Sequence, residues 1–366
     1  MAEYIYIAGA ASRARTTKEY LEYLNPEIRT IAYLVSPEMT DNEDSVDGVP
    51  VIKIQAGADV DTACKVYLGT RGVNQGKLAG ELRDIGFSEE LIIPVSVELD
   101  TKLRNEYVKR KFADAGKSFV KFNEHSRRNV NSETRGHLSV SIYMASSAFD
   151  GKLSDPYVPL AEEKILLVGT ALTDKRLGDD GICDNTGDNI SDKNKQFCEL
   201  TGLYWIWKNT SEDIVGLVHY RRHFLLPENW TEIFASNEVD VILPIPLYVA
   251  PSVEENYRQR HVSSDWDNML DYLKEHYPED YAPACVFFKN GLYSPCNMLI
   301  ARKHVLDELC KWMFPILFAI ADKGGVRDDA YQNRYPGFVS ERLITYFFES
   351  RRDRYKVVYA DKNFLA

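Results

Sequence analysis

The sequence predicts an α/β protein with two domains, and three observations support this prediction. The chain has 366 residues, which is more than one hydrophobic core usually serves. Short β-rich runs alternate with segments of helical spacing, first between residues 4 and 95 and again from residue 138 onward. Between these regions the chain is polar and lacks periodicity, so we expect an N-terminal domain at 1–125, a linker at 126–137 and a second domain at 138–366.

The N-terminal segment alternates between strand-like and helix-like runs. We expect strands at 4–9, 31–35, 50–54, 63–68 and 91–95, and helices at 16–24 and 74–85. This order implies parallel strands joined by crossover helices, which is a Rossmann-like layer. The turn after the first strand, residues 9–13, keeps only the first glycine of G-x-G-x-x-G, so it is either a nucleotide-binding turn or a tight connection. The degenerate motif disfavours an N-terminal oxidoreductase.

Composition and charge indicate a soluble protein with small-molecule substrates. The formal net charge of -11 and the pI near 5.3 argue against a nucleic-acid partner, which would require a basic face to neutralise phosphates. Apolar residues make up 45% and aromatic residues 12% of the chain. The aromatic side chains suit either core packing or stacking against sugars and bases.

The six cysteines and the apolar runs favour a cytoplasmic protein. The cysteines form no CxxC pair, and no histidine stands at metal-ligand spacing, so we expect neither a metal site nor disulfides, and no cofactor. The longest apolar stretch, residues 312–321, is about half a membrane span. Peripheral attachment to the inner face of a membrane stays open, because a lipid-linked acceptor would require it.

Four sequence blocks of the second segment carry a resemblance to a known family. They are DNTGDNISDKN at 184–194, CELTGLYWIWKN at 198–209, GLVHYRRHF at 216–224 and GFVSERL at 337–343. In this order and spacing they resemble a family first catalogued as a domain of unknown function and found in capsular and exopolysaccharide synthesis proteins. Some members of that family are assigned as galactosyl or galactofuranosyl transferases.

The resemblance implies a GT-A-like glycosyltransferase domain at 138–366, with a UDP-sugar as co-substrate and a glycan or lipid-linked glycan as acceptor. A hexosyltransferase for galactose or galactofuranose is the expected activity. One departure leaves the donor open: relatives carry a His-Lys pair shortly after the first strand of this domain, where this chain has residues 144–149, MASSAF. A non-catalytic nucleotide- or glycan-binding module is the alternative interpretation.

The run from Ile214 to Arg222 looks like a buried strand that delivers basic and aromatic groups at its carboxyl end, where ligands bind in open α/β sheets. We expect Arg221 or Arg222 to neutralise the leaving diphosphate without a divalent cation, although both could be surface arginines paired with carboxylates. Ser191 could instead cap the helix that we expect over 196–207. Asn297 lies in a strand expected over 293–301, and it could instead be a turn residue before a core strand. The candidate donor-binding residues are Asp188, Asn189, Ser191, Asn194, Lys208, His219, Tyr220, Arg221, Arg222 and Asn297.

An inverting transfer requires a carboxylate that takes the proton of the acceptor hydroxyl. Glu341 is the first candidate, because it follows a turn-like Gly337-Phe338 and would begin a helix whose dipole favours the ionised form. Asp328 and Asp329, beside a glycine-rich loop, are the alternatives. A structural ion pair between Glu341 and its neighbour Arg342 remains the competing interpretation.

Overall fold

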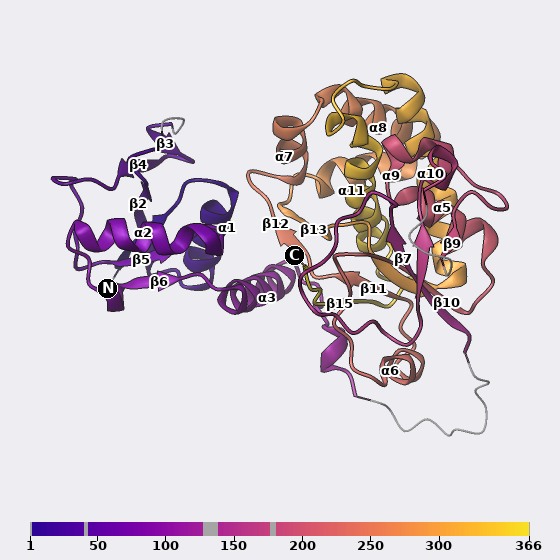
Figure 1. The fold of residues 1–366 in the computed structure, drawn as a ribbon, viewed down its shortest axis with the longest axis horizontal. Helices are drawn as coiled ribbons and strands as arrows, with labels where there is room; N and C mark the ends of the chain where they lie inside the picture. The colour runs from indigo at the N-terminus through magenta and orange to yellow at the C-terminus, as the bar shows by residue number, and fades with distance from the viewer. Residues whose placement is uncertain (1, 40–42, 127–137, 176–180, 366) are drawn as a thin grey trace. The chain divides into compact units, whose positions relative to one another are not determined.

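The computed structural model describes residues 2–39, 43–126, 138–175 and 181–365, and these fall into two compact units (Figure 1). The first unit comprises Met1–Ser118 with Tyr248–Ala250, and the second comprises Phe119–Leu247 with Pro251–Ala366. The chain therefore passes between units before the expected linker, of which residues 127–137 lie outside the described part of the chain. Both units are α/β, which confirms the predicted fold class.

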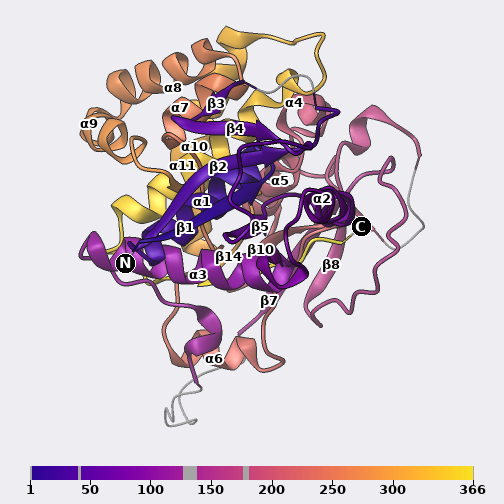
Figure 2. The same cartoon turned by 90° about the vertical axis from the view of Figure 1, so that its left-hand side faces the viewer.

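The first unit contains a six-stranded sheet in the order β3-β4-β2-β1-β5-β6 (Figure 2). Strand β1 pairs in parallel with β2 and β5, as the strand-helix-strand alternation predicts. The short strand β3, antiparallel to β4, and the helix α3 were not predicted. The elements are β1 (Glu3–Ala8), α1 (Ser12–Leu24), β2 (Ile28–Val35), β3 (Ser45–Val46), β4 (Val49–Lys53), β5 (Lys65–Leu68), α2 (Gly72–Asp84), β6 (Ile92–Pro94) and α3 (Val97–Asp114).

The second unit contains a seven-stranded mixed sheet in the order β15-β11-β14-β10-β7-β8-β9. Its central strand β10 is buried at all six positions, runs parallel to β7 and is antiparallel to β14. Two short strands, β12 (Leu247–Tyr248) and β13 (Leu292–Tyr293), lie outside this sheet. The sheet strands are β7 (Val140–Ser146), β8 (Glu163–Leu167), β9 (Ile182–Cys183), β10 (Ile214–His219), β11 (Val241–Pro244), β14 (Leu299–Arg302) and β15 (Val357–Ala360).

Helices cover both faces of this sheet because side chains alternate along β10. Ile214 and Val218 pack into a core with Trp230 of α6, whereas Leu217 on the other face reaches Gly202 of α5. No helix of the described residues is both long and apolar enough to span a bilayer. The helices are α4 (Asn194–Phe197), α5 (Leu200–Asn209), α6 (Trp230–Ser236), α7 (Val253–Arg260), α8 (Ser263–His276), α9 (Pro278–Phe287), α10 (Lys303–Gly324) and α11 (Tyr335–Ser350).

Two elements expected to be continuous are interrupted. The helix expected over 196–207 breaks between α4 and α5, where Cys198 has a φ of +49°. The strand expected over 293–301 begins only at Leu299, because Cys296 and Asn297 have φ values of +79° and +51°. These left-handed conformations are uncommon for residues other than glycine and asparagine. Asn297 is thus the turn residue before a core strand that the alternative interpretation gave, whereas no pattern signalled the two cysteines.

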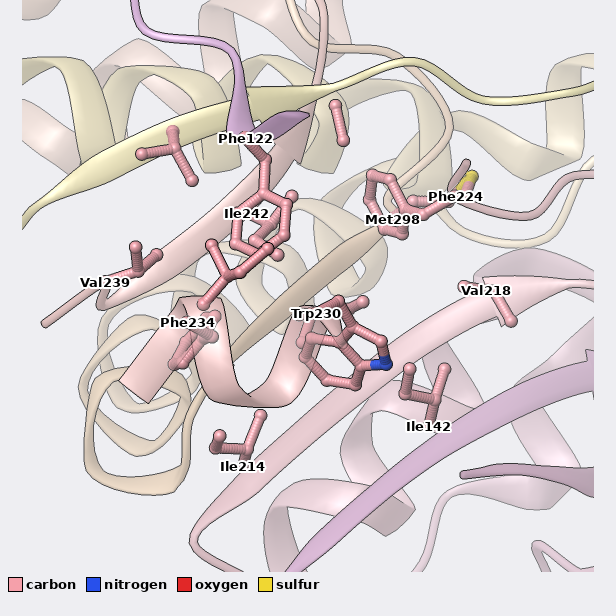
Figure 3. Close-up of a cluster of buried hydrophobic side chains, with 14 residues drawn as sticks. Phe122, Ile142, Ile214, Val218, Phe224, Trp230, Phe234, Val239, Ile242 and Met298 are labelled. Atoms are coloured by element: carbon pink, nitrogen blue, oxygen red, sulfur yellow. The ribbon is translucent and has the colours of Figure 1, made fainter. Parts of the chain in front are cut away.

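Trp230 anchors the core between α6 and the sheet (Figure 3). Its ring is 1% exposed, and its indole N–H donates to Glu162 Oε2 at 3.1 Å. We expect Trp230→Ala to lower the free energy of unfolding by about 3–5 kcal/mol, because the substitution leaves a large cavity. Urea unfolding measures this loss, and Trp207→Ala, which removes a partly exposed ring, serves as the matched control with a smaller loss. Equal losses in the two variants would contradict this account of the core.

Candidate active site

A small cavity opens at the carboxyl end of β10, where ligands bind in open α/β sheets. Its volume is about 240 Å³, and its walls come from the end of β10, the junction of α4 and α5, the segment before β14, and α11. It therefore lies where the two interrupted elements meet the sheet edge. The lining residues are Cys198, Glu199, His219, Arg222, Cys296, Arg334, Gly337, Phe338 and Glu341.

A larger cavity of about 1150 Å³ lies at the opposite edge of the same sheet, where β11 and β15 begin. Its arginines are paired with carboxylates: Arg302 Nε lies 3.4 Å from an Asp240 oxygen, and Arg354 Nη2 lies 2.6 Å from a Glu308 oxygen. These charges neutralise one another, so we place the candidate active site in the smaller cavity.

The turn after β10 brings His219 and Arg222 to the cavity. The backbone N–H of each donates to the carbonyl of the other at 3.0 Å, so the chain reverses over the two residues between them. The two side chains approach to 3.5 Å, between His219 Nδ1 and Arg222 Nη1. Burial lowers the pKa of His219, which makes it a neutral hydrogen-bonding group at neutral pH. Its Nε2 is buried and has no hydrogen-bond partner in the described part of the chain.

Glu341 lies on α11 with its carboxylate at the cavity and its side chain 17% exposed. One oxygen accepts from the Cys296 backbone N–H at 2.6 Å, and the other accepts from Arg342 Nη1 at 2.7 Å. The ion pair of the competing interpretation is therefore present, and Glu341 also faces the cavity. Burial raises the pKa of Glu341 although both of these partners lower it. The helix begins at Tyr335, so Glu341 stands in its second turn. The expected place in the first turn after a Gly337 turn, and the expected shift towards the ionised form, were therefore wrong.

A second carboxylate, Glu199, faces the same cavity from the junction of α4 and α5. Asn297 donates from Nδ2 to Glu199 Oε1 at 2.8 Å and to the Gly337 carbonyl at 3.1 Å, and it accepts from Ser340 Oγ at 2.7 Å. Asn297 thus ties Glu199 to α11 from behind the cavity and does not line it. Backbone strain at its left-handed φ is concentrated beside the cavity, as is common at functional sites.

Two guanidinium groups face these carboxylates. Arg222 comes from the turn after β10, and Arg334 stands at the exposed mouth of the cavity, where its Nε lies 3.0 Å from Cys198 Sγ. No ion pair between either arginine and a carboxylate is found among the residues that the structure describes. A pair of cationic groups without a carboxylate partner can bind an anion such as a diphosphate.

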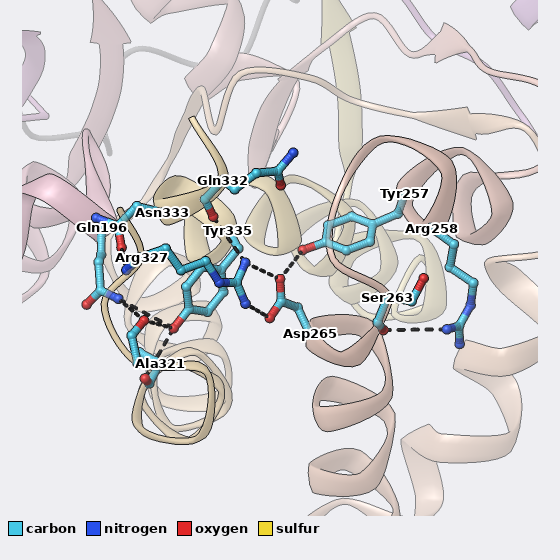
Figure 4. A network of polar contacts seen from close by, with 11 residues as sticks. Gln196, Tyr257, Arg258, Ser263, Asp265, Ala321, Arg327, Gln332, Asn333 and Tyr335 are labelled. Carbon is cyan, nitrogen blue, oxygen red and sulfur yellow. Dashed lines mark hydrogen bonds and ion pairs between the residues drawn. The ribbon is translucent and has the colours of Figure 1, made fainter. Parts of the chain in front are cut away.

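The segment that carries Arg334 is held by a buried ion pair (Figure 4). Asp265 of α8 is fully buried; it accepts two hydrogen bonds from the guanidinium of Arg327, one of them at 2.9 Å. The same guanidinium stacks over the Tyr335 ring with 4.0 Å between its carbon and the ring centroid. Because Arg327 and Tyr335 flank Arg334 in sequence, these contacts fix the chain on both sides of it.

The polar block that begins at Asp184 is a folded loop outside the cavity. Asp184 is fully buried and accepts hydrogen bonds from the Gly169 and Thr170 backbone N–H groups and from the hydroxyls of Thr170, Ser191 and Thr201. The candidate donor-binding residue Ser191 is therefore part of a buried network. The other three candidates of this block also bond within the loop and its neighbouring helix: Asp188 to Tyr204, Asn189 to Gly187 and Asn194 to Cys198.

The remaining sequence candidates do not line the cavity. Arg221 donates to the Leu365 carbonyl at 3.3 Å, and Lys208 lies 3.6 Å from the ring centroid of Trp207. Tyr220 is partly buried in the turn itself. Asp328 is exposed, and exposed Asp329 accepts from the Tyr331 and Gln332 N–H groups. Of the candidates, the structure brings together His219, Arg222 and Glu341.

Sequence reasoning missed Glu199, Arg334, Cys198 and Cys296. Glu199 had an available signal, because it stands in the CELTGLYWIWKN block that carried the resemblance. Arg334 had none, since it precedes α11 in a segment without pattern. Burial raises the pKa of both Cys198 and Cys296 to about 11, so these thiols are protonated at neutral pH. Among the described residues, no group of three or more His, Cys, Asp or Glu side chains could hold a metal ion.

Comparisons with known proteins point to one family. The family model described as "Domain of unknown function (DUF4422)" matches residues 158–352, more than half of the chain. Among solved structures, the bifunctional glycosyltransferase WbbM in its apo form is similar with a TM-score of 0.53 and 27% sequence identity, over 62% of this chain and 45% of that chain. This chain therefore spans less than half of that protein.

A weaker likeness links the chain to the X-ray structure of the mannosyltransferase Ktr4p from S. cerevisiae. The TM-score is 0.30 at 9% identity, over 71% of this chain and 80% of that chain. No curated protein matches the sequence. The likeness to WbbM agrees with the predicted α/β glycosyltransferase fold.

Proposed function

The chain belongs to the DUF4422 family, and on this premise we propose that its second unit is a glycosyltransferase that moves a hexose from a UDP-sugar. The similarity to WbbM supports the reaction class. Galactose, in pyranose or furanose form, is the proposed sugar, and a surface polysaccharide or lipid-linked glycan is the proposed acceptor. A lipid-linked acceptor would bring the protein to the inner face of the cell membrane without insertion.

One observation carries this proposal: Arg222 and Arg334, without carboxylate partners among the described residues, share a 240 Å³ cavity with Glu199 and Glu341. Glycosyl transfer from a nucleotide sugar needs cationic groups for the departing diphosphate and a carboxylate for the acceptor proton. The cavity is smaller than the roughly 300–1,000 Å³ of most ligand pockets. We therefore assign to it the reacting sugar and diphosphate, and not the whole nucleotide.

The proposed step is a single displacement. An acceptor hydroxyl oxygen bonds to the anomeric carbon of the donor while the bond from that carbon to the diphosphate oxygen breaks. The hydroxyl proton passes to Glu341, whose raised pKa makes it a stronger base than an ordinary carboxylate once it is ionised. The diphosphate leaves with the bonding electron pair, and Arg222 and Arg334 balance its charge. His219 is neutral and can hydrogen-bond to sugar or phosphate from Nε2.

The two arginines also support a metal-independent reaction, and this can be tested directly. We expect the protein to release UDP from UDP-galactose or UDP-galactofuranose in the presence of a glycan acceptor, at a rate that excess EDTA does not change. A coupled assay for released nucleoside diphosphate measures it across a panel of nucleotide sugars. Loss of all activity in EDTA, restored by manganese, would refute the metal-free reaction. Absence of turnover with every donor and acceptor would refute the proposal that the second unit is a glycosyltransferase.

A further inference from the structure

The first unit contains a second cavity, outside the region that the family model matches. Its volume is about 730 Å³, and it lies at the carboxyl ends of β1, β2 and β5. From β1 the sheet extends to β2 and β4 on one side and to β5 and β6 on the other, so the order of strands reverses between β1 and β5. Ligands of open α/β sheets bind at this kind of reversal point.

Two glycines shape the floor of this cavity. Gly9, directly after β1, has a φ of +106°, a backbone conformation that residues other than glycine rarely adopt. A Cβ on Gly69, directly after β5, would lie 2.8 Å from Ala14 Cα and 2.9 Å from Ile7 Cγ2. Glycine at both positions lets the end of β5 approach the start of α1 closely, which leaves the crevice open above them.

Two helices begin at the cavity, and no side chain among the described residues caps either of them. Helix α1 has Ala11 at its N-cap, and α2 has Arg71 at its N-cap. By contrast, α3 is capped by Ser96 Oγ, which accepts from the Leu99 N–H at 3.1 Å, and α3 does not line the cavity. The uncapped N–H groups of two 13-residue helices and their positive dipole ends therefore converge on one space.

Cationic side chains stand beside these helix ends. Arg13 lines the cavity; its Nη2 donates to the Val95 carbonyl at 3.3 Å, and its Nε is buried without a hydrogen-bond partner in the described residues. Exposed Arg71 also lines it, and the described residues show no ion pair for either arginine. The site is thus built to accept negative charge.

The end of β2 supplies a different chemistry. Glu38 lines the cavity with its side chain 77% exposed and forms an ion pair with Lys77. A carboxylate after the second strand of such a sheet can accept hydrogen bonds from ribose hydroxyls. Met39, which is 52% exposed beside it, offers an apolar contact for a base.

We propose that this cavity binds a nucleotide, with its phosphates at the amino ends of α1 and α2 and its ribose at Glu38. The site is separate from the proposed transferase site and does not depend on it. It gives the first unit the function of a nucleotide-binding module on the same chain.

Isothermal titration calorimetry of the full-length protein tests this proposal with UDP, ADP and pyrophosphate as probes. The titrations use an Arg222→Ala/Arg334→Ala background, which removes the other proposed site. We expect UDP or ADP to bind at one site per chain in this background. Adding Arg13→Gln and Arg71→Gln should weaken that binding at least about tenfold, since each substitution removes a charge-assisted hydrogen bond to phosphate. Arg15→Ala, on the same helix but outside the cavity, should bind normally.

Ala11→Asp separates loss of the site from loss of the fold. Aspartate at this exposed N-cap should cap α1 and raise the thermal unfolding midpoint, while its charge should abolish nucleotide binding. Glu38→Gln should weaken the binding of nucleotides but not the binding of pyrophosphate, which has no ribose. The proposal is overturned if no nucleotide binds in the Arg222→Ala/Arg334→Ala background, if Ala11→Asp binds as the parent does, or if pyrophosphate binds as tightly as the nucleotides.

Discussion

Glu341→Gln should lower the turnover number of the transferase by roughly 100- to 10,000-fold, the range that loss of a general base produces. The amide cannot take the proton of the acceptor hydroxyl, yet it keeps the shape of the carboxylate. Its one oxygen can accept from the Cys296 N–H or from Arg342, but not from both, so circular dichroism and the thermal midpoint must first show that the variant is folded. Donor affinity should change little, because the proton transfer occurs only during reaction. Steady-state kinetics with the preferred donor measures the turnover, and calorimetric titration with the same donor measures the affinity.

The pH profile provides a second readout for Glu341. Burial raises the pKa of this carboxyl above its ordinary value, so the base-competent form is lost on acidification at a higher pH than for an exposed glutamate. The activity of the wild-type protein should therefore rise with pH through a limb that lies at higher pH than an exposed glutamate would give. Glu275→Gln, an exposed glutamate on α8, is the control and should leave both profile and turnover unchanged. Full activity in Glu341→Gln would transfer the role of base to Glu199.

The fold could be predicted where the spacing of apolar residues in the sequence follows which side chains are buried. In the first unit, each expected strand and helix has a counterpart within a few residues, because parallel strands buried by crossover helices read as apolar runs. The short strand β3 was not predicted, because it has only two residues, Ser45 and Val46, which is too few to show an alternating pattern. Helix α3 was missed because apolar residues are sparse along it and only three are buried: Tyr107, Val108 and Phe112.

The candidate site could be predicted only in part, for a reason that three residues illustrate. Cys198, Cys296 and Asn297 adopt left-handed conformations that interrupt a helix and a strand. Glycine at these positions would have signalled a break, and asparagine signals one more weakly, but cysteine does not. These interruptions turn Glu199 and the Cys296 N–H towards the cavity. The constellation depends on tertiary packing that overrides local preference, which sequence periodicity does not record.

The block at 184–194 shows why polar richness alone does not locate a binding site. Short polar side chains bind ligands and also satisfy buried loops, and composition does not separate these uses. The buried carboxylate of Asp184 collects its hydrogen bonds from within the loop and adjacent turns, so the block is explained by folding. In contrast, Arg221 and Arg222 follow the carboxyl end of a buried strand, which is where ligands bind in open α/β sheets. One of the two, Arg222, lines the cavity.

Arg222→Ala should lower the turnover number by roughly 100- to 1,000-fold, the effect of removing one preorganised donor to a developing negative charge. Its guanidinium has no carboxylate partner among the described residues, so the substitution leaves no orphaned acid in the fold. Arg222→Lys should recover part of the rate, because an ammonium keeps the charge but loses bidentate geometry. Arg334→Ala should show a smaller loss, since Arg334 stands at the exposed mouth of the cavity. Initial rates at saturating acceptor measure all three.

Arg221→Ala is the matched control for Arg222→Ala. Arg221 is adjacent in sequence, but its Nε donates to the Leu365 carbonyl and its side chain does not line the cavity. Arg221→Ala should therefore retain most of the turnover, and Arg354→Ala, which removes a largely exposed charge paired with Glu308, should retain all of it. If Arg221→Ala lost as much activity as Arg222→Ala while both proteins stayed folded, the diphosphate would bind outside this cavity. The geometry of the turn after β10 would then have to change on donor binding.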